Sequence, residues 1–301
     1  MASFHLFAVE DAGPRALAVP PDAAQFADLY RGLPLGVYDA LRTFDHNKFL
    51  YLSRHLARTE RSMALLGWDY PLDRPRLLRA LHDIVTGSDW PEMRARIDIL
   101  AGPAEALGTR SRELIAIQPF TPPPAALYER GVAVDFAAGV SRGQPLVKAA
   151  AFAAARPTSA GLAQLENTKD EIRDTKEPAA APYELLLLDD QRRILEGTGT
   201  NFWAMRDGVV YTAGEGVLEG ITREIILKLI ADMGIPLRLE AIAAGEIGTL
   251  DEAALSGSSR AFLPVVEIAG QRIGDGRPGP LGGRILAAYN EFVAAHVMPA
   301  I

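Results

Sequence analysis

The chain of 301 residues contains no cysteine, and this absence removes several kinds of site at once. Disulfide bonds, thiolate nucleophiles and thiolate metal ligands all require cysteine, so none of them can operate here. Histidine is also scarce, because only five residues occur and no two of them stand at a spacing that favours metal binding. The sequence therefore predicts a protein whose functional site contains no metal.

Long apolar runs are missing as well. No apolar stretch reaches the roughly 18 residues that a membrane-spanning helix needs, and the segment MASFHLFAVEDAG lacks the basic start and apolar run of a signal peptide. The formal net charge of −7 disfavours a nucleic-acid binder, which would need a basic face. We expect a cytoplasmic protein with no nucleic-acid or membrane partner, although a local basic pocket for an anionic ligand stays open.

The composition that is present is that of a globular enzyme. Hydrophobic residues make up 49% of the chain and charged residues 23%, which suffices for a core large enough for two domains. Three consecutive prolines at 122–124 can neither continue a helix nor donate to a sheet, so they indicate a domain boundary. We predict a small N-terminal α/β domain at 1–121 and a larger C-terminal domain at 122–301.

Apolar periodicity predicts helices and strands in an irregular order, which favours a mixed α+β fold over a doubly wound parallel sheet. The strand at 94–100 is expected to be half-buried, with Arg94, Arg96 and Asp98 on the side away from the core. The predicted helices are 53–67, 73–87, 222–233 and 281–297, and the remaining predicted strands are 113–118, 132–136, 184–188 and 261–268, with a hairpin at 201–212.

The stretch Gly220-Ile221-Thr222-Arg223 opens the predicted helix at 222–233. The first backbone N–H groups of a helix have no partner within it, and the helix dipole favours an anion there. The hydroxyl of Thr222 can add a donor, so this helix start is a candidate anion site. The alternative is that Thr222 only caps the helix.

Two further polar turns carry candidate residues. Ser256-Gly257-Ser258-Ser259-Arg260 offers hydroxyl and amide donors that suit a phosphate or carboxylate, although a plain polar loop would have the same composition. Glu196 follows an apolar strand within a glycine-rich turn, and carboxylates are seldom buried without a partner. This acid is therefore a candidate partner for a protonated ring nitrogen, the alternative being a solvated turn residue.

These three features occur in one order along the chain, and that order resembles the class IV pyridoxal-phosphate (PLP) aminotransferases. The group includes branched-chain aminotransferase, D-amino-acid aminotransferase and aminodeoxychorismate lyase. The resemblance runs from about Gly36 to Tyr289. The matching segments are Leu195-Glu196-Gly197 with Asn201-Phe202, Val217 to Arg223, Ser256 to Ser259 with Pro264-Val265, and in the first half Tyr38 to Thr43 and His55-x-x-Arg58-x-x-x-Ser62.

The resemblance implies a two-domain PLP fold of type IV, with a mixed α/β pseudo-barrel as the larger domain, and a homodimer. It also implies roles for single residues, with pyridoxal 5′-phosphate as the cofactor. Glu196 would keep the ring nitrogen protonated, which makes the ring an electron sink. Arg58 matches the family's phosphate arginine, the alternative being a surface residue on an amphipathic helix. The other implied cofactor-binding residues are Ile221, Thr222, Gly257 and Ser258.

Transamination with PLP also needs a lysine that forms a Schiff base with the cofactor and then transfers a proton during the reaction. The family's lysine follows a segment of the form Arg-x-x-Pro-x-x-Lys, which fits 142–148, and the apolar residues after Lys148 would favour its nucleophilic form. We therefore favour Lys148 as the catalytic residue, with Lys169 as the runner-up and a surface position for Lys148 as the alternative. Lys228 lies inside a predicted helix and fits no motif.

Two departures from the family pattern concern the region of this lysine. Glu196 follows Lys148 by 48 residues, which is longer than the usual family spacing, and we interpret the highly charged stretch 164–177 as a solvated insertion. The tyrosine that many members carry just after the lysine has no equivalent, since Phe152 and Ala153 occupy that zone. The insertion raises the chance of altered or lost catalysis.

The resemblance implies a PLP-dependent aminotransferase that exchanges an amino group between an amino acid, branched-chain-like or D-configured, and a 2-oxo acid. Arg42, Ser259 and Arg260 are candidate substrate-binding residues, although each arginine could equally be a structural ion-pair partner. A pyruvate-releasing lyase of the aminodeoxychorismate lyase type is the nearest alternative. A degenerate PLP-binding non-enzyme is a further one, and an unrelated sugar or nucleotide binder is disfavoured.

Overall fold

The computed structural model describes residues 4–21, 23, 26–30, 32–155 and 181–301. Lys169 and the charged stretch 164–177 lie outside the described residues. The chain divides into two compact units, and it passes from the first into the second at Pro123. The first unit contains Met1–Pro122, Gln144–Ala155 and Glu291–Ile301, and the second contains Pro123–Gly143 and Arg156–Asn290. The assignment of all of 122–301 to one domain stays a prediction, since two segments beyond residue 122 fall in the first unit.

The first unit is built on a five-stranded antiparallel sheet, in the order β2-β1-β6-β5-β3. Its strands are β1 (His5–Glu10), β2 (Gly13–Leu17), β3 (Gly36–Arg42), β5 (Met93–Leu100) and β6 (Glu113–Pro119). A separate pair is formed by β4 (Lys48–Leu50) and β16 (Val297–Pro299). The short helices of this unit are η1 (Phe26–Tyr30), η2 (Glu105–Leu107) and α4 (Ala150–Ala155).

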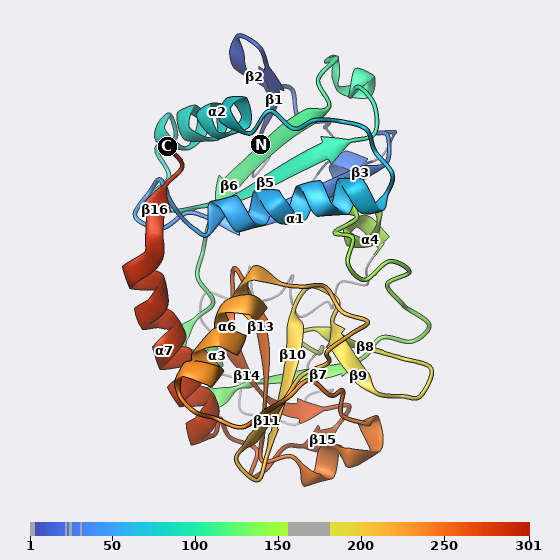
Figure 1. Cartoon of the computed structure of the whole chain (residues 1–301), viewed down its shortest axis with the longest axis vertical. Helices are drawn as coiled ribbons and strands as arrows, with labels where there is room; N and C mark the ends of the chain where they lie inside the picture. The colour runs from blue at the N-terminus through green and yellow to red at the C-terminus, as the bar shows by residue number, and fades with distance from the viewer. Residues whose placement is uncertain (1–3, 22, 24–25, 31, 156–180) are drawn as a thin grey trace. The chain divides into compact units, whose positions relative to one another are not determined.

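Two amphipathic helices, α1 (Leu52–Leu65) and α2 (Arg74–Thr86), lie along one face of this sheet (Figure 1). The helix predicted at 73–87 is confirmed in detail. The Asp73 side chain accepts the backbone N–H of Arg76 at 3.0 Å, and Gly87 is the C-cap. The core between helices and sheet is apolar, and among its buried members are Val37, Leu41, Leu56, Met63, Leu77, Leu81, Ile97 and Ile99.

The expectation that β5 is half-buried is wrong, because the second face of the sheet is covered as well. Arg96 and Asp98 are 5% and 4% exposed and form an ion pair with each other at 3.0 Å. The guanidinium of Arg96 also lies over the rings of Tyr30 and Tyr38, which η1 and β3 supply. Burial raises the pKa of Asp98 to about 6, although Arg96 opposes the shift. Sequence alternation alone did not reveal this cover, since η1 and α4 come from distant parts of the chain.

The second unit contains six strands that close into a ring, in the order β10-β13-β14-β7-β8-β9, with β9 pairing back to β10. The pairs β7–β8 and β7–β14 are parallel and the other pairs of the ring are antiparallel. This confirms the expected mixed α+β fold with a strand barrel. The ring strands are β7 (Val132–Phe136), β8 (Leu185–Leu188), β9 (Ile194–Gly197), β10 (Asn201–Arg206), β13 (Glu252–Gly257) and β14 (Ala261–Ile268).

The predicted hairpin after residue 200 is present, with Asp207 and Gly208 at its turn, where φ is 53° and 74°. The predicted helix at 222–233 is α6 (Ile221–Asp232), and Gly234 follows it with a φ of 65°. The remaining elements are β11 (Val209–Tyr211), β12 (Leu237–Arg238), β15 (Gln271–Arg272), α3 (Ala125–Arg130), η3 (Ala244–Thr249) and α7 (Pro280–His296).

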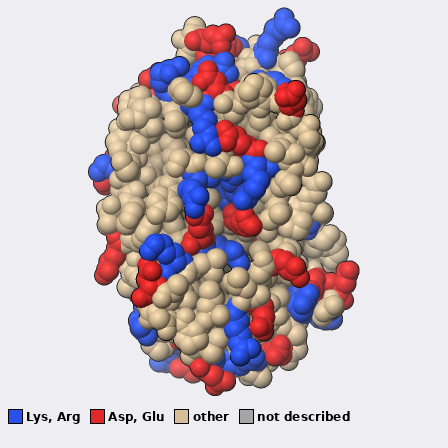
Figure 2. All heavy atoms as spheres, viewed as in Figure 1, with Lys and Arg blue, Asp and Glu red and all other residues tan. Residues whose placement is uncertain are grey.

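Among the described residues, no helix is both long enough and apolar enough to cross a membrane. Lys and Arg side chains lie close to Asp and Glu side chains over the face shown in Figure 2. Exposed ion pairs occur among the described residues, such as Lys48 with Asp45 at 3.0 Å. Such exposed pairs stabilise a fold only slightly.

A buried ion pair joins α1 to β3 in the first unit. Asp39 is 0% exposed, and its carboxylate accepts hydrogen bonds from Arg58 Nε at 3.0 Å and Arg58 Nη2 at 2.7 Å. The ring nitrogen Nδ1 of His55 lies 2.7 Å from the same carboxylate. Burial by itself would raise the pKa of Asp39, but the charges of Arg58 and His55 and their hydrogen bonds hold it well below its ordinary value. This cluster fixes the position of α1 on the sheet.

We predict that replacing Asp39 by Asn lowers the free energy of unfolding at pH 7 by about 3–5 kcal/mol, because Arg58 is left buried without its counter-charge. The depressed pKa of Asp39 means that its stabilisation is complete above the ordinary carboxyl pKa of about 4 and is lost as the pH falls further. Denaturant unfolding should therefore show a difference between the two proteins that shrinks in acid. The control Asp45→Asn, in an exposed pair, should cost less than about 1 kcal/mol. Equal losses in the two variants would contradict the prediction.

Candidate functional site

Three segments that are distant in sequence meet at one end of the six-stranded ring, and Asn201 is their common neighbour. Its backbone pairs with Glu196 of β9 and with Ser256 of β13. Its side-chain Nδ2 donates to the carbonyl of Leu218 at 2.9 Å, in the segment that leads into α6. The acidic turn, the start of α6 and the serine-rich turn are therefore assembled around one residue.

Glu196 is buried at this end of the ring, with 1% exposure, so it is not a solvated turn acid. Its Oε2 accepts hydrogen bonds from the backbone N–H of Leu218 at 3.1 Å and from Asn201 Nδ2 at 3.3 Å. Its Oε1 accepts Arg142 Nε at 2.8 Å, and the Arg142 side chain is itself only 8% exposed. A carboxylate with this set of donors is held in one place, and Arg142 supplies its counter-charge.

The start of α6 carries the predicted anion-binding residues. Its N-cap is Gly220, which forms no side-chain capping bond, and Ile221 and Thr222 follow as buried residues of the first turn. A Cβ atom at Gly220 would lie 2.3 Å from Oδ1 of Asn201, so only glycine fits beside that amide. The position of Thr222 inside the helix disfavours the alternative that it is the cap. The first-turn amides are the donors that suit an anion.

The serine-rich turn joins β13 to β14 and lies next to the glycine-rich turn. Ser256 is buried, and its Oγ accepts the indole N–H of Trp203 at 2.9 Å. A Cβ atom at Gly257 would lie 3.6 Å from the Thr200 methyl group, which shows how closely the two turns approach each other. Ser258 and Ser259 follow as partly exposed residues at the same end of the ring. The structure thus brings together the predicted residues Glu196, Ile221, Thr222, Gly257, Ser258 and Ser259.

Glu184 supports this site and was missed by the sequence analysis. It is 2% exposed, and its Oε1 accepts the backbone N–H of Gly199 at 2.5 Å, in the turn between Glu196 and Asn201. A Cβ atom at Gly197 would meet the Glu184 carboxylate at 2.6 Å, so the turn lies directly on this side chain. The signal in the sequence was an acid at the start of the apolar run that forms β8, which is the same kind of signal that singled out Glu196.

The two candidate substrate arginines are both held by neighbouring side chains. Arg42, in the first unit, forms an ion pair with Glu92 at 2.8 Å, and its guanidinium lies 4.1 Å from the Phe120 ring. Arg260, in the second unit, donates from Nε to the Tyr183 hydroxyl at 2.8 Å. Burial opposes the charged form of Arg260, but the nearby Glu184 and Tyr183 raise its pKa. These contacts favour the structural alternative, and a role in substrate binding stays a prediction for both.

Arg58 and Lys148 belong to the first unit and are described within it. Arg58 is 5% exposed and paired with Asp39, so it is not a surface arginine. Lys148 is partly exposed, and its backbone lies against the outer edge of β3, where its carbonyl accepts the N–H of Tyr38 at 3.0 Å. The structure therefore places both residues at the junction of α1 and β3.

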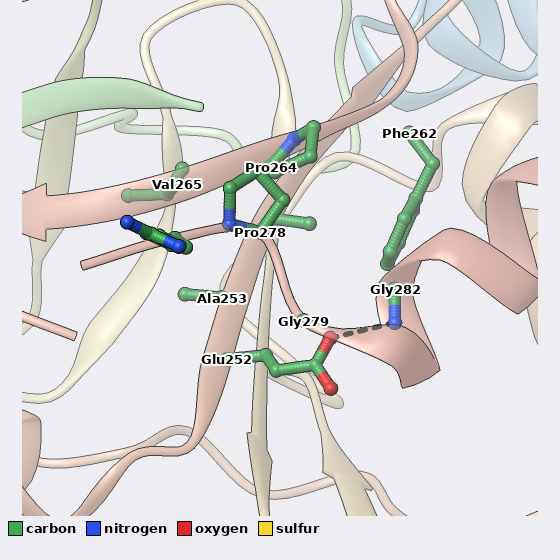
Figure 3. A pocket seen from close by; sticks show the side chains of 10 residues that line it. Glu252, Ala253, Phe262, Pro264, Val265, Pro278, Gly279 and Gly282 are labelled. Atoms are coloured by element: carbon green, nitrogen blue, oxygen red, sulfur yellow. Dashed lines mark hydrogen bonds between the residues drawn. The ribbon is translucent and has the colours of Figure 1, made fainter. Parts of the chain in front are cut away.

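A pocket elsewhere in the second unit lies between β13, β14 and the start of α7 (Figure 3). The Glu252 carboxylate accepts the backbone N–H groups of Leu281 at 2.9 Å and Gly282 at 2.7 Å. A Cβ atom at Gly279 would lie 2.1 Å from Glu252 Cδ, so glycine permits this close approach. Because Glu252 already satisfies the first-turn donors of α7, this pocket does not offer them to an external anion.

The family description "Amino-transferase class IV" matches residues 36–268 of the chain. A branched-chain-amino-acid aminotransferase of Pseudomonas aeruginosa is 37% identical over 112 residues, which are 37% of this chain and 36% of that protein. A D-alanine aminotransferase of Staphylococcus aureus is 31% identical over 105 residues, which are 34% of this chain and 37% of that protein. Each alignment therefore spans little more than a third of the relative.

A solved structure extends the likeness over the whole fold. It is a branched-chain amino acid aminotransferase from T.th. with pyridoxamine 5′-phosphate, and it superposes with a TM-score of 0.75. The two chains are 18% identical, and the match covers 99% of this chain and 98% of the other. At this identity the likeness concerns the fold, and it agrees with the two units and the strand barrel described above.

We predict that replacing Gly220 by Ala disturbs the candidate site, because the new methyl group would displace the Asn201 amide that binds Leu218 and Glu196. Overpacking of this kind costs about 1–3 kcal/mol, which denaturant unfolding can measure. Gly283→Ala is the control, since a Cβ atom there has nothing within 4 Å and its place inside α7 favours alanine by up to about 1 kcal/mol. A Gly220→Ala protein as stable as the wild type would show that the close contact with Asn201 is not required.

Proposed function

Because the chain belongs to the class IV aminotransferases, we propose that it transfers an amino group between an amino acid and a 2-oxo acid with pyridoxal 5′-phosphate as cofactor. The observation that carries the proposal is the buried Glu196 at the end of the barrel, beside the start of α6. The carboxylate suits the ring nitrogen at one end of this cofactor, and the amide donors of α6 suit the phosphate at the other end.

The donor set of the second unit fits the cofactor. Glu196 is paired with Arg142 and can accept a hydrogen bond from a protonated ring nitrogen, while the amides of Ile221 and Thr222 and the hydroxyl of Ser258 suit the phosphate. The hydroxyl of Thr200 is buried at the same end of the ring without a hydrogen-bond partner among the described residues. Buried polar groups normally have partners, so an unsatisfied one is in keeping with a site that receives a polar ligand.

When bound, PLP supplies an aldehyde that a lysine engages as a Schiff base and a protonated ring that withdraws electrons. We propose that Lys148 is this lysine and that its amine also moves the proton during transfer. The motif Arg-x-x-Pro-x-x-Lys and the anchoring of Lys148 in the first unit support the choice. We further propose Arg58 as a phosphate ligand, since it matches the family's phosphate arginine and a guanidinium suits a bidentate contact with a phosphate.

The substrate is proposed to be a branched-chain-like or a D-configured amino acid, because the relatives are named for one or the other. We propose Ser259 as a substrate contact, since it is partly exposed beside Ser258. We also propose a homodimer, on the basis of the family resemblance. The net charge of −7 and the lack of a long apolar run support a cytoplasmic protein without nucleic-acid or membrane partners.

A lyase on the same fold is the second candidate function. The zone after Lys148, where many members of the family carry a tyrosine, holds Phe152 and Ala153 of α4, and this departure does not distinguish transfer from lysis. Release of pyruvate from aminodeoxychorismate, in place of amino-group exchange with a 2-oxo acid, would decide for the lyase. A protein that binds PLP but catalyses neither reaction would be a degenerate family member.

We predict that the purified protein with added PLP develops the visible absorbance of a lysine Schiff base. Borohydride reduction should then fix the cofactor on Lys148, because this lysine fits the family segment, and mass mapping of the modified peptide should find it there. A label on Lys169 would overturn the choice of lysine. No absorbance and no labelled lysine would overturn the proposed function itself.

We also predict that Glu196→Gln keeps the fold but loses turnover by about 100-fold or more, the size of effect expected when one charge that stabilises the transition state is removed. Glutamine keeps an acceptor for the Leu218 N–H but cannot hold the ring nitrogen protonated. Turnover with a saturating amino acid measures the effect, and unfolding checks the fold. The control is Glu240→Gln, a solvent-exposed glutamate of the second unit, which should leave turnover within about twofold. Near-normal turnover of Glu196→Gln would remove its assigned role.

A further inference from the structure

The segment 144–155 returns to the first unit, and two buried side chains fix it on either side of Lys148. Val147 is 3% exposed and belongs to the core between the sheet and α1. Ala150 is 1% exposed and packs against Tyr38 on the other side of β3. A Cβ atom at Gly36 would lie 3.4 Å from the Ala150 methyl group, so α4 lies close to this strand. Lys148 therefore stands between two anchored neighbours.

The backbone of Lys148 is bound on both sides. Its carbonyl accepts the N–H of Tyr38 at 3.0 Å, and its own N–H donates to the Oγ of Ser62 at 3.3 Å. An isolated bridge between Val37 and Ala149 adds to this pairing. Because β3 is the last strand of its sheet, the backbone N–H and C=O groups on its outer edge are not paired within the sheet. The segment that carries Lys148 forms hydrogen bonds with this edge.

Ser62 links the lysine to the buried ion pair of the first unit. It is 0% exposed, and its hydroxyl donates to the carbonyl of Arg58 at 2.9 Å while accepting the Lys148 N–H. Arg58 in turn binds Asp39, which is the residue after Tyr38 on β3. Both backbone anchors of Lys148 are thus neighbours of the Asp39–Arg58 pair.

The side chain of Lys148 is also held. Its Nζ lies 4.7 Å from the centre of the Tyr38 ring, within the range of a cation–π contact, and that ring is 8% exposed. The charge of Lys148 also contributes to lowering the pKa of His55, after burial and the charge of Arg58 and against Asp39. A lysine side chain is long and flexible, so such a contact restricts where the amine lies.

We propose that Ser62 and Tyr38 are positioning residues that hold Lys148 at the edge of β3. The inference rests on the proposed function, in which the Lys148 amine reacts with PLP. Ser62 fixes the lysine backbone through its hydroxyl, and Tyr38 fixes the backbone through its N–H and the amine through its ring. A group that is already held in the reactive geometry reacts faster than a mobile one, because less entropy is lost when the transition state is reached.

The test measures the attachment of PLP to Lys148 in the full chain, without reference to turnover. Samples are reduced with borohydride at intervals after PLP is added, and the modified Lys148 peptide is quantified by mass. The variants are Ser62→Ala, which loses the hydroxyl, and Ser62→Thr, which keeps one. Thr59→Val is the matched control, because the Thr59 hydroxyl is buried in α1 and donates to the carbonyl of His55 at 3.2 Å, four residues earlier.

Loss of one hydrogen bond to Lys148 should slow labelling about three- to tenfold in Ser62→Ala, whereas Ser62→Thr and Thr59→Val should stay within about twofold of the wild type. Exchange of the Lys148 amide hydrogen should accelerate in Ser62→Ala only. For the ring, Tyr38→Phe should behave as the wild type, and Tyr38→Leu should slow labelling about two- to fivefold and move its pH midpoint.

Equal labelling rates in Ser62→Ala and Thr59→Val, with the wild type labelled on Lys148, would overturn the role of Ser62 and leave the proposed function standing. Equal rates in Tyr38→Phe and Tyr38→Leu would overturn the role of the ring in the same way. A wild-type label on another lysine would overturn the assignment of Lys148 in the proposed function, and the positioning proposal with it.

Discussion

The burial of a charged carboxylate at the end of the barrel is the constraint on which the candidate site depends. A carboxylate removed from water is stable only if hydrogen bonds and a counter-charge replace its hydration. Glu196 obtains them from three separate segments, through Arg142, Asn201 and Leu218. Hydrogen bonding to this one acid therefore brings β10, the segment before α6 and the loop that carries Arg142 to the strand that carries Glu196.

The glycines of the site follow from the same constraint. Side chains that converge on one carboxylate leave little room for the backbone around it. Gly197 lies on the Glu184 carboxylate and Gly220 lies on the Asn201 amide, at distances that a Cβ atom could not share. The first-turn amides of α6 have no partner within the helix, so the start of α6 next to Gly220 has donors for an anion.

The sheet of the first unit has a buried aspartate on each face, and the pKa values of these two aspartates are shifted in opposite directions. Asp39 has two positively charged or chargeable partners, and its pKa is depressed. Asp98 is paired with Arg96, but burial outweighs that charge, so its pKa rises to about 6. The Asp39–Arg58 pair connects α1 to β3, and it lies next to the segment that carries Lys148. Asp98 is an acid that can change its protonation state near neutral pH.

The sequence by itself determined the elements and the family. Apolar periodicity and the ordered motifs are local signals, because each depends on residues that are neighbours along the chain. The tertiary structure alone decided which polar side chains are buried and what they bind. Arg96 was predicted on an open face and is buried against the rings of Tyr30 of η1 and Tyr38 of β3. Arg142 binds Glu196, and Glu184 binds the turn that follows Glu196, and neither contact could be predicted from the sequence. The physical reason is that burial and ion pairing depend on segments far apart in the chain, whose approach no local pattern records.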